Sequence, residues 1–187
     1  YIKDNFLDQE LFDLVKKDIT KFDKIDFPGK SFWVHPAADE LVKYITIKLS
    51  IIENCKVENI LSFFREAKKN QDDDWRIHND AIIDGQQPDR AVVLYVKANE
   101  HSLNGTAFWE HVDYGHAYDN SNQEEFNRML LEDADDESKW KLNSVIGYKS
   151  NRLLSYPCEY FHSKYPNKFK DQRIVVVMFY KYLWNIF

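Results

Sequence analysis

The spacing of the apolar residues changes near residue 56, and this change restricts the fold more than any other feature. Before it, apolar side chains recur every three or four residues over 6–22 and again over about 37–54, as on one face of a helix. Asp8 stands where a helix cap is expected, and Phe27-Pro28-Gly29 interrupts the pattern. Residues 1–56 are therefore predicted to form a helical leader.

After residue 56 the chain consists of short β-branched or aromatic runs separated by turn residues, which is typical of strands. The expected strands cover 60–64, 75–83, 91–97, 106–111, 145–148, 153–156 and 174–183. Among only five glycines, Gly85, Gly105 and Gly147 are expected at turns or close backbone approaches. The pattern predicts a mostly β protein with some α: a double-stranded β-helix, or jelly roll, with N-terminal helices packed on one sheet.

One stretch, at about 114–141, breaks the run of strands and is strongly acidic. Its helical signal is limited to Phe126, Met129 and Leu130. It is interpreted as an insertion over one end of the barrel, acting either as a lid or as a solvated loop. The length of 187 residues suits one domain, with the leader at 1–56 and the barrel at 57–187.

Composition argues against several classes of function. With 31 acidic and 25 basic residues the formal charge is −6, which disfavours binding to a nucleic-acid backbone. The longest apolar runs are too short to cross a bilayer, so no membrane association is expected. Cys55 and Cys158 are far apart and fit no metal-binding spacing, which favours a reducing compartment and a cytoplasmic location.

The sequence contains two His-x-Asp triplets, His78-Asn79-Asp80 and His111-Val112-Asp113. On a strand, residues i and i+2 point to the same side, so either triplet could present an imidazole and a carboxylate to one ion. A second histidine would complete the two-histidine, one-carboxylate set that leaves open positions on iron(II). Enough strand-forming chain to build barrel walls follows the first triplet, whereas the acidic insertion follows the second. The first triplet is therefore preferred.

The C-terminal part supplies the partners of this triplet. His162 is followed eleven residues later by Arg173, which opens the strongest predicted strand. A guanidinium buried at the start of an apolar strand needs a charge partner. A dicarboxylate co-substrate would provide one through a bidentate pair.

Read together, these motifs resemble the prolyl-4-hydroxylase-like branch of the 2-oxoglutarate and iron(II) oxygenases, particularly its small bacterial and phage-type members. The order is a His-x-Asp, a Tyr-bearing strand at 92–96, a Gly-led strand at 105–109, the run Asn151-Arg152-Leu153-Leu154, a distal histidine and a basic residue. The resemblance implies iron ligation by His78, Asp80 and His162. It further implies that Arg173 binds 2-oxoglutarate and that Tyr95 hydrogen-bonds it.

The activity implied by the resemblance is that of a dioxygenase using iron(II), 2-oxoglutarate and O2 to hydroxylate an unactivated C–H bond. The substrate would be a prolyl residue of a protein or peptide, or a small metabolite. Trp109 and His111 are candidates for the substrate-facing rim, although His111 and Asp113 could equally form a hydrogen-bonded surface pair. The alternatives are a cupin-like isomerase or sugar-binding barrel that does not use 2-oxoglutarate, and a metal-free jelly roll.

Overall fold

The computed structural model describes residues 1–19, 21–27, 30–68, 76–98, 104–118, 122–166 and 172–183. Within these ranges the helices are α1 (Gln9–Asp18), α2 (Asp39–Glu53) and α3 (Gln123–Asp133), with a 3-10 turn at Glu137–Lys139. The strands are β1 (Ile2–Lys3), β2 (Asp23–Phe27), β3 (Lys30–Pro36), β4 (Lys56–Ala67), β5 (Arg90–Ala98), β6 (Gly105–His111), β7 (Trp140–Ile146), β8 (Leu153–Pro157), β9 (His162–Tyr165) and β10 (Arg173–Leu183). No helix in the described ranges is long and apolar enough to cross a membrane.

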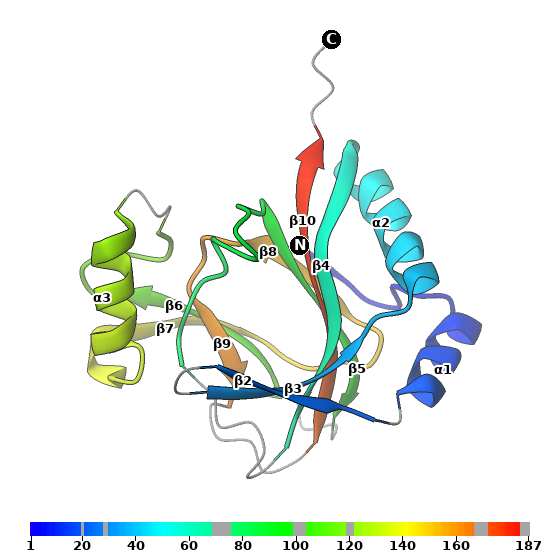
Figure 1. Cartoon of the computed structure of the whole chain (residues 1–187), viewed down its shortest axis with the longest axis horizontal. Coiled ribbons are helices and arrows are strands. Elements are labelled where there is room, and N and C mark those ends of the chain that lie inside the picture. Colours follow the sequence, from blue (N-terminus) through cyan, green and yellow to red (C-terminus); the bar gives the residue numbers. More distant parts are fainter. Residues whose placement is uncertain are drawn as a thin grey trace.

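The strands pair into two antiparallel sheets. The larger has the order β1-β8-β5-β10-β4-β3-β2 and the smaller the order β7-β6-β9. Strand β10 runs through the middle of the larger sheet, between β4 and β5 (Figure 1). The chain is thus a jelly roll, a double-stranded β-helix, as the sequence predicts.

Alternation along the strands sorts the apolar side chains into separate layers. On β5, Val92, Leu94 and Val96 point outward and pack with the side chains of α1 and α2. The intervening Ala91, Val93 and Tyr95 point inward, into a second cluster between the two sheets. Because β5 is covered on both faces, it reads as a continuous apolar run instead of an alternating one.

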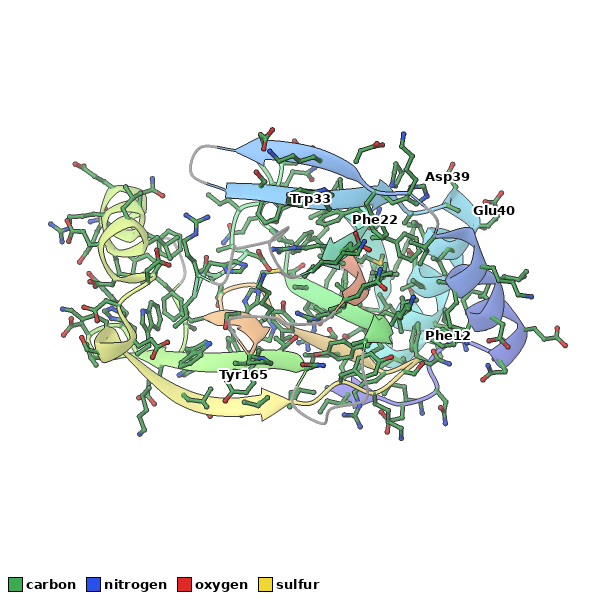
Figure 2. The ribbon with its side chains drawn as sticks, turned by 90° about the horizontal axis from the view of Figure 1, so that it is seen from below. Phe12, Phe22, Trp33, Asp39, Glu40 and Tyr165 are labelled. Carbon is green, nitrogen blue, oxygen red and sulfur yellow. The ribbon has the colours of Figure 1, made fainter. Side chains whose placement is uncertain are left out.

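The helices lie at two opposite ends of the molecule. Helices α1 and α2 stand at one end, where Phe12 of α1 is buried, and α3 stands at the other, beside the smaller sheet (Figure 2). Asp8 precedes α1 as expected, but its side chain makes no cap hydrogen bond. Its carboxylate accepts a hydrogen bond from the hydroxyl of Tyr44 on α2, which ties the two helices together.

The prediction that the leader is wholly helical is wrong, because a β-hairpin lies between α1 and α2. Strands β2 and β3 pair from Asp23↔Val34 to Phe27↔Lys30, and β3 continues the larger sheet beyond β4. Phe22, which the pattern assigned to the first helix, lies after its end, with its ring centroid 6.3 Å from that of His35 on β3. The outer strand β2 forms the sheet edge and is exposed and mostly polar, so it lacks the apolar alternation that identifies a strand. The apolar run of β3, Phe32-Trp33-Val34, is too short to show a period.

The strand expected at 75–83 is also absent from the described part of that segment, 76–83, while Trp75 lies outside the described residues. The segment makes only isolated bridges, His78↔His162 and Ile83↔Gln86. Conversely, the short strand β9 was not predicted, and β7 begins earlier than expected, at Trp140. Short segments such as these carry too few apolar residues to show a period.

The insertion at 114–141 contains α3, and the three apolar residues that signalled a helix all fall within it. On the buried face of α3, Phe126 and Met129 are buried and Leu130 is partly buried. They belong to a third apolar cluster that includes Trp140 of β7. The helix therefore packs on the barrel and is not a purely solvated loop.

Asn151 fastens the N-terminal segment to the barrel. It is buried and left-handed, with φ of 60°, and its amide both accepts from the N–H and donates to the carbonyl of Leu7, each at 2.8 Å. Asn151→Ala is expected to lower the free energy of unfolding by about 2–4 kcal/mol, since it leaves buried polar groups unsatisfied and strains the backbone. Urea denaturation measures this loss. Asn151→Gly relieves only the strain, so near-wild-type stability of that variant would contradict the role given to the hydrogen bonds.

Candidate metal centre

Backbone pairing between distant segments brings His78 and His162 side by side. The N–H of His78 donates to the carbonyl of His162 at 3.1 Å, and the N–H of His162 donates back at 2.8 Å. Their ring centroids are 4.5 Å apart. A further bond, from the N–H of Asp80 to the carbonyl of Cys158 at 2.9 Å, places Asp80 in front of both rings.

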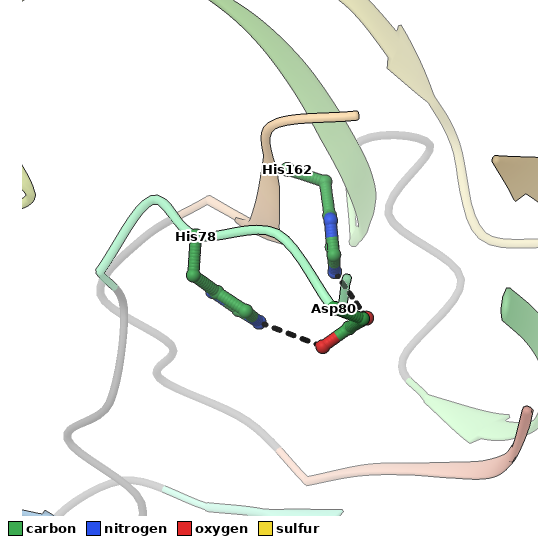
Figure 3. Close-up of side chains that lie close together, drawn as sticks. All are labelled: His78, Asp80 and His162. Atoms are coloured by element: carbon green, nitrogen blue, oxygen red, sulfur yellow. Dashed lines mark ion pairs between the residues drawn. The ribbon is translucent and has the colours of Figure 1, made fainter. Parts of the chain in front are cut away.

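The three side chains converge on one point (Figure 3). The carboxylate of Asp80 lies between the imidazoles, with Oδ1 3.9 Å from Nε2 of His78 and Oδ2 3.2 Å from Nε2 of His162. One potential ligand atom from each residue lies within 4.8 Å of the others. In the described ranges, no other group of three His, Cys, Asp or Glu side chains meets this geometry.

The remaining ring nitrogens fix how each imidazole is presented. Nδ1 of His78 lies 2.9 Å from the carbonyl of Arg76, and Nδ1 of His162 lies 3.0 Å from the carbonyl of Tyr160. Because a carbonyl can only accept, each Nδ1 carries a proton, and each ring presents Nε2 to the shared point. A backbone carbonyl behind each histidine is the usual support of a metal-binding imidazole.

The electrostatics keep Asp80 ionised. Burial alone would raise the pKa of Asp80, whose side chain is 14% exposed. Attraction from His162, with smaller contributions from His78 and Arg65, outweighs burial and lowers that pKa. Two imidazole nitrogens and one carboxylate oxygen form the facial set that suits iron(II).

The second triplet forms no such cluster. His111 is 1% exposed, and its Nδ1 accepts from the backbone N–H of Asp113 at 3.2 Å. Its Nε2 therefore carries the proton and donates to Oδ2 of Asp133, on α3, at 3.1 Å. His111 is thus neither substrate-facing nor part of a surface pair with the carboxylate of Asp113. Both nitrogens are occupied: Nδ1 holds the local turn at Asp113, and Nε2 ties α3 to the barrel.

Asp133→Ala is expected to lower the free energy of unfolding by about 1–3 kcal/mol, since His111 would keep a buried donor without its acceptor. Metal affinity should not change. Urea denaturation and a Co(II) titration measure the two properties, with exposed Asp135→Ala as the matched control on the same turn. Loss of metal binding in the Asp133 variant would mean that the wrong triplet has been chosen.

Trp109 packs in an apolar cluster and also borders a cleft. Its indole N–H donates to Oγ of Ser163 at 2.9 Å, and its ring belongs to the apolar cluster beneath α3. The residue also borders a cleft next to the barrel interior. Its predicted contact with substrate stays a prediction.

Arg173 and Tyr95, the two residues predicted to bind the co-substrate, lie close together between the two sheets. Arg173 is 7% exposed, and its guanidinium carbon lies 5.4 Å from the centroid of the fully buried Tyr95 ring. Thr106 of β6 joins them: its hydroxyl lies 2.8 Å from the hydroxyl of Tyr95 and accepts from Nη2 of Arg173 at 3.4 Å. The group combines one cation and two hydroxyls, all buried, and such a set of donors suits a carboxylate.

Two residues of this interior were not anticipated from the sequence. Thr106 could have been noticed as a polar residue inside an apolar strand. Tyr156 of β8 is buried with its ring centroid 4.8 Å from that of His162. Burial, reinforced by the charge of Asp80, raises the pKa of its hydroxyl well above the usual value.

Gly105 lies at a close backbone approach, as expected, because a Cβ there would lie 1.8 Å from the carbonyl oxygen of Ile146.

No protein-family model matches the chain, and no curated protein matches it. Solved structures do. HygX from Streptomyces hygroscopicus, with nickel and 2-oxoglutarate bound, is similar at a TM-score of 0.59 and 14% identity, over 98% of this chain and 82% of HygX. The viral collagen prolyl hydroxylase of Paramecium Bursaria Chlorella virus-1 gives 0.54 and 15%, over 98% and 90% of the two chains.

A prolyl hydroxylase from Trichoplax adhaerens, in complex with a hypoxia inducible factor peptide, gives a TM-score of 0.54 at 14% identity, over 97% of this chain and 83% of that one. At such low identities these likenesses establish the fold. The chain has the double-stranded β-helix found in oxygenases that use 2-oxoglutarate and iron(II).

Proposed function

We propose that this chain is an iron(II)- and 2-oxoglutarate-dependent dioxygenase that hydroxylates an unactivated C–H bond. One observation carries the proposal: His78, Asp80 and His162 converge on a point inside a jelly roll that also buries Arg173 between its sheets. The fold alone would not be enough, because jelly rolls serve many functions.

The donor set fits iron(II). Both histidines direct Nε2 at the shared point because their Nδ1 atoms are held by backbone carbonyls, and Asp80 is ionised. These three residues would hold the metal on one side and leave positions for other ligands.

The interior fits 2-oxoglutarate. Arg173 would bind the distal carboxylate, while the hydroxyls of Tyr95 and Thr106 would orient it by hydrogen bonds. When bound, iron(II), 2-oxoglutarate and O2 supply the oxidising power for C–H hydroxylation, with succinate and CO2 as by-products. Buried aromatic rings, including Tyr156 beside His162, would exclude water from the reacting atoms.

The substrate is proposed to be a prolyl residue of a peptide or a small metabolite. Structures of similar fold include HygX with hygromycin B bound, and a prolyl hydroxylase with a peptide fragment bound. Both types of substrate are therefore compatible with this fold.

Anaerobic titration of the protein with iron(II) and then 2-oxoglutarate tests the proposal. Chelation of the metal by the 2-oxo acid should produce a weak visible absorption band, and later admission of O2 should produce succinate. Metal binding with no response to 2-oxoglutarate would instead favour a cupin-like isomerase or sugar-binding barrel.

A further inference from the structure

A cleft of about 670 Å³ opens beside the metal centre, and the proposed function does not yet assign it. It lies where the sandwich is open, between residues of β8 in the larger sheet and of β6 and β7 in the smaller one. Its volume is in the range of small-molecule sites.

The cleft is joined to the metal centre by a row of aromatic rings. The ring of Tyr156 lies 4.8 Å from that of His162, and Phe108 packs edge-on against Tyr156 at 5.1 Å and Tyr160 at 6.5 Å. Phe161, which immediately precedes His162, also lines the cleft. A group seated against these rings is thus only one side chain away from the histidine.

The cleft offers very little free charge. Among the described residues that line it there is no Asp, Glu or Lys, and the basic side chains are those of Arg90 and His116. Arg90 is held by the protein: Nε donates to Oγ of Ser155 at 2.9 Å, Nη2 donates to the carbonyl of Ser155 at 3.0 Å, and Glu53 lies 3.6 Å away. Exposed Asn143 and Ser144 supply uncharged hydrogen-bonding groups at the rim.

We infer that this cleft binds the primary substrate through an uncharged, largely aliphatic group flanked by neutral hydrogen-bonding groups such as amides. The inference rests on the proposed function. A free ammonium would lose its hydration in this cleft without meeting a carboxylate among the described lining residues. A free carboxylate would meet only His116 and the guanidinium of Arg90, which Ser155 and Glu53 already hold, whereas an aliphatic group gains from burial there. Of an amino acid and its N-acetylated amide, the cleft therefore selects the neutral amide over the zwitterionic amino acid.

Matched probes test this selection without turnover. Protein loaded with Co(II) and N-oxalylglycine, an unreactive analogue of 2-oxoglutarate, is titrated with N-acetyl-leucinamide and with free leucine, and then with N-acetyl-prolinamide and free proline. Binding is followed by NMR. Each neutral probe is expected to bind at least about tenfold more tightly than its zwitterion.

Two variants locate the binding. Tyr160→Ala should weaken the neutral probes at least about tenfold, while Tyr44→Ala, on α2 and outside the cleft lining, should not. The backbone carbonyl of Tyr160 that supports His162 is retained in the alanine variant. Ser144→Asp places a charge on an exposed strand position and should shift the preference towards leucinamide, which carries a free ammonium group.

The outcomes separate the two claims. Failure to bind Co(II) or N-oxalylglycine would refute the proposed function itself. If both bind, the inference is overturned by equal affinity for the two forms of a probe, by binding of neither form, or by a Tyr160 variant that behaves like the Tyr44 variant.

Discussion

Asp80→Ala is expected to abolish tight metal binding, with the dissociation constant for iron(II) or Co(II) raised more than about 100-fold. Loss of even an outer partner of a metal ligand costs about 10–100-fold, and Asp80 is the only carboxylate of the cluster. Two neutral imidazoles would remain, without the negative charge that offsets the charge of the ion. Anaerobic titration followed by calorimetry measures the change.

The second His-x-Asp triplet provides the matched control. Asp113→Ala removes an exposed carboxylate from an equivalent sequence position, and the backbone N–H that binds His111 is kept. This variant should bind metal like the unaltered protein. Retention of metal by Asp80→Ala together with its loss by Asp113→Ala would reverse the assignment.

Arg173→Ala should weaken 2-oxoglutarate binding by about 100-fold or more, which corresponds to about 3 kcal/mol, and reduce succinate formation accordingly. The co-substrate carboxylate would then be buried without a cation, while the hydroxyls of Tyr95 and Thr106 could offer only neutral hydrogen bonds. Metal affinity should stay unchanged. Calorimetric titration of the metal-free variant with Co(II) measures the metal affinity. Titration of the Co(II)-loaded variant with 2-oxoglutarate measures the co-substrate affinity.

Two further substitutions sharpen this test. Arg173→Lys keeps the charge but not the planar pair of donors, so an intermediate affinity for 2-oxoglutarate is expected. Arg152→Ala removes a different guanidinium, one paired with Asp4 at 2.6 Å, and should affect stability more than co-substrate affinity. Normal succinate production by Arg173→Ala would exclude the proposed role of this residue.

The elements that the sequence predicts well are those whose burial imposes a clear period. Helix α2 and strands β5 and β10 agree closely with expectation, because each is packed against the core along most of its length. The hairpin β2–β3 was missed because its outer strand β2, at the sheet edge, needs no apolar alternation, and β3 has only a short apolar run. Local pattern therefore predicts the centre of this sheet better than its margin.

In the candidate site, too, local sequence pattern predicts some features and misses others. His78 and Asp80 were chosen on the assumption that a strand carries them, but they lie outside any regular strand and are aligned by the bridge to His162. The residues were identified by type and order, while the reason for their convergence is tertiary. Thr106 was missed because its role depends on Tyr95 and Arg173, which come from other strands.

The paired backbone bonds between His78 and His162 also bear on the order of events during synthesis. The two residues belong to segments far apart in the chain, so the ligand set stays incomplete until the later segment has emerged and docked. A nascent chain that ends before β9 carries one imidazole and one carboxylate and has no means of retaining a redox-active ion tightly. Metal acquisition by the proposed site would thereby be restricted to chains in which the walls around the ion can already close.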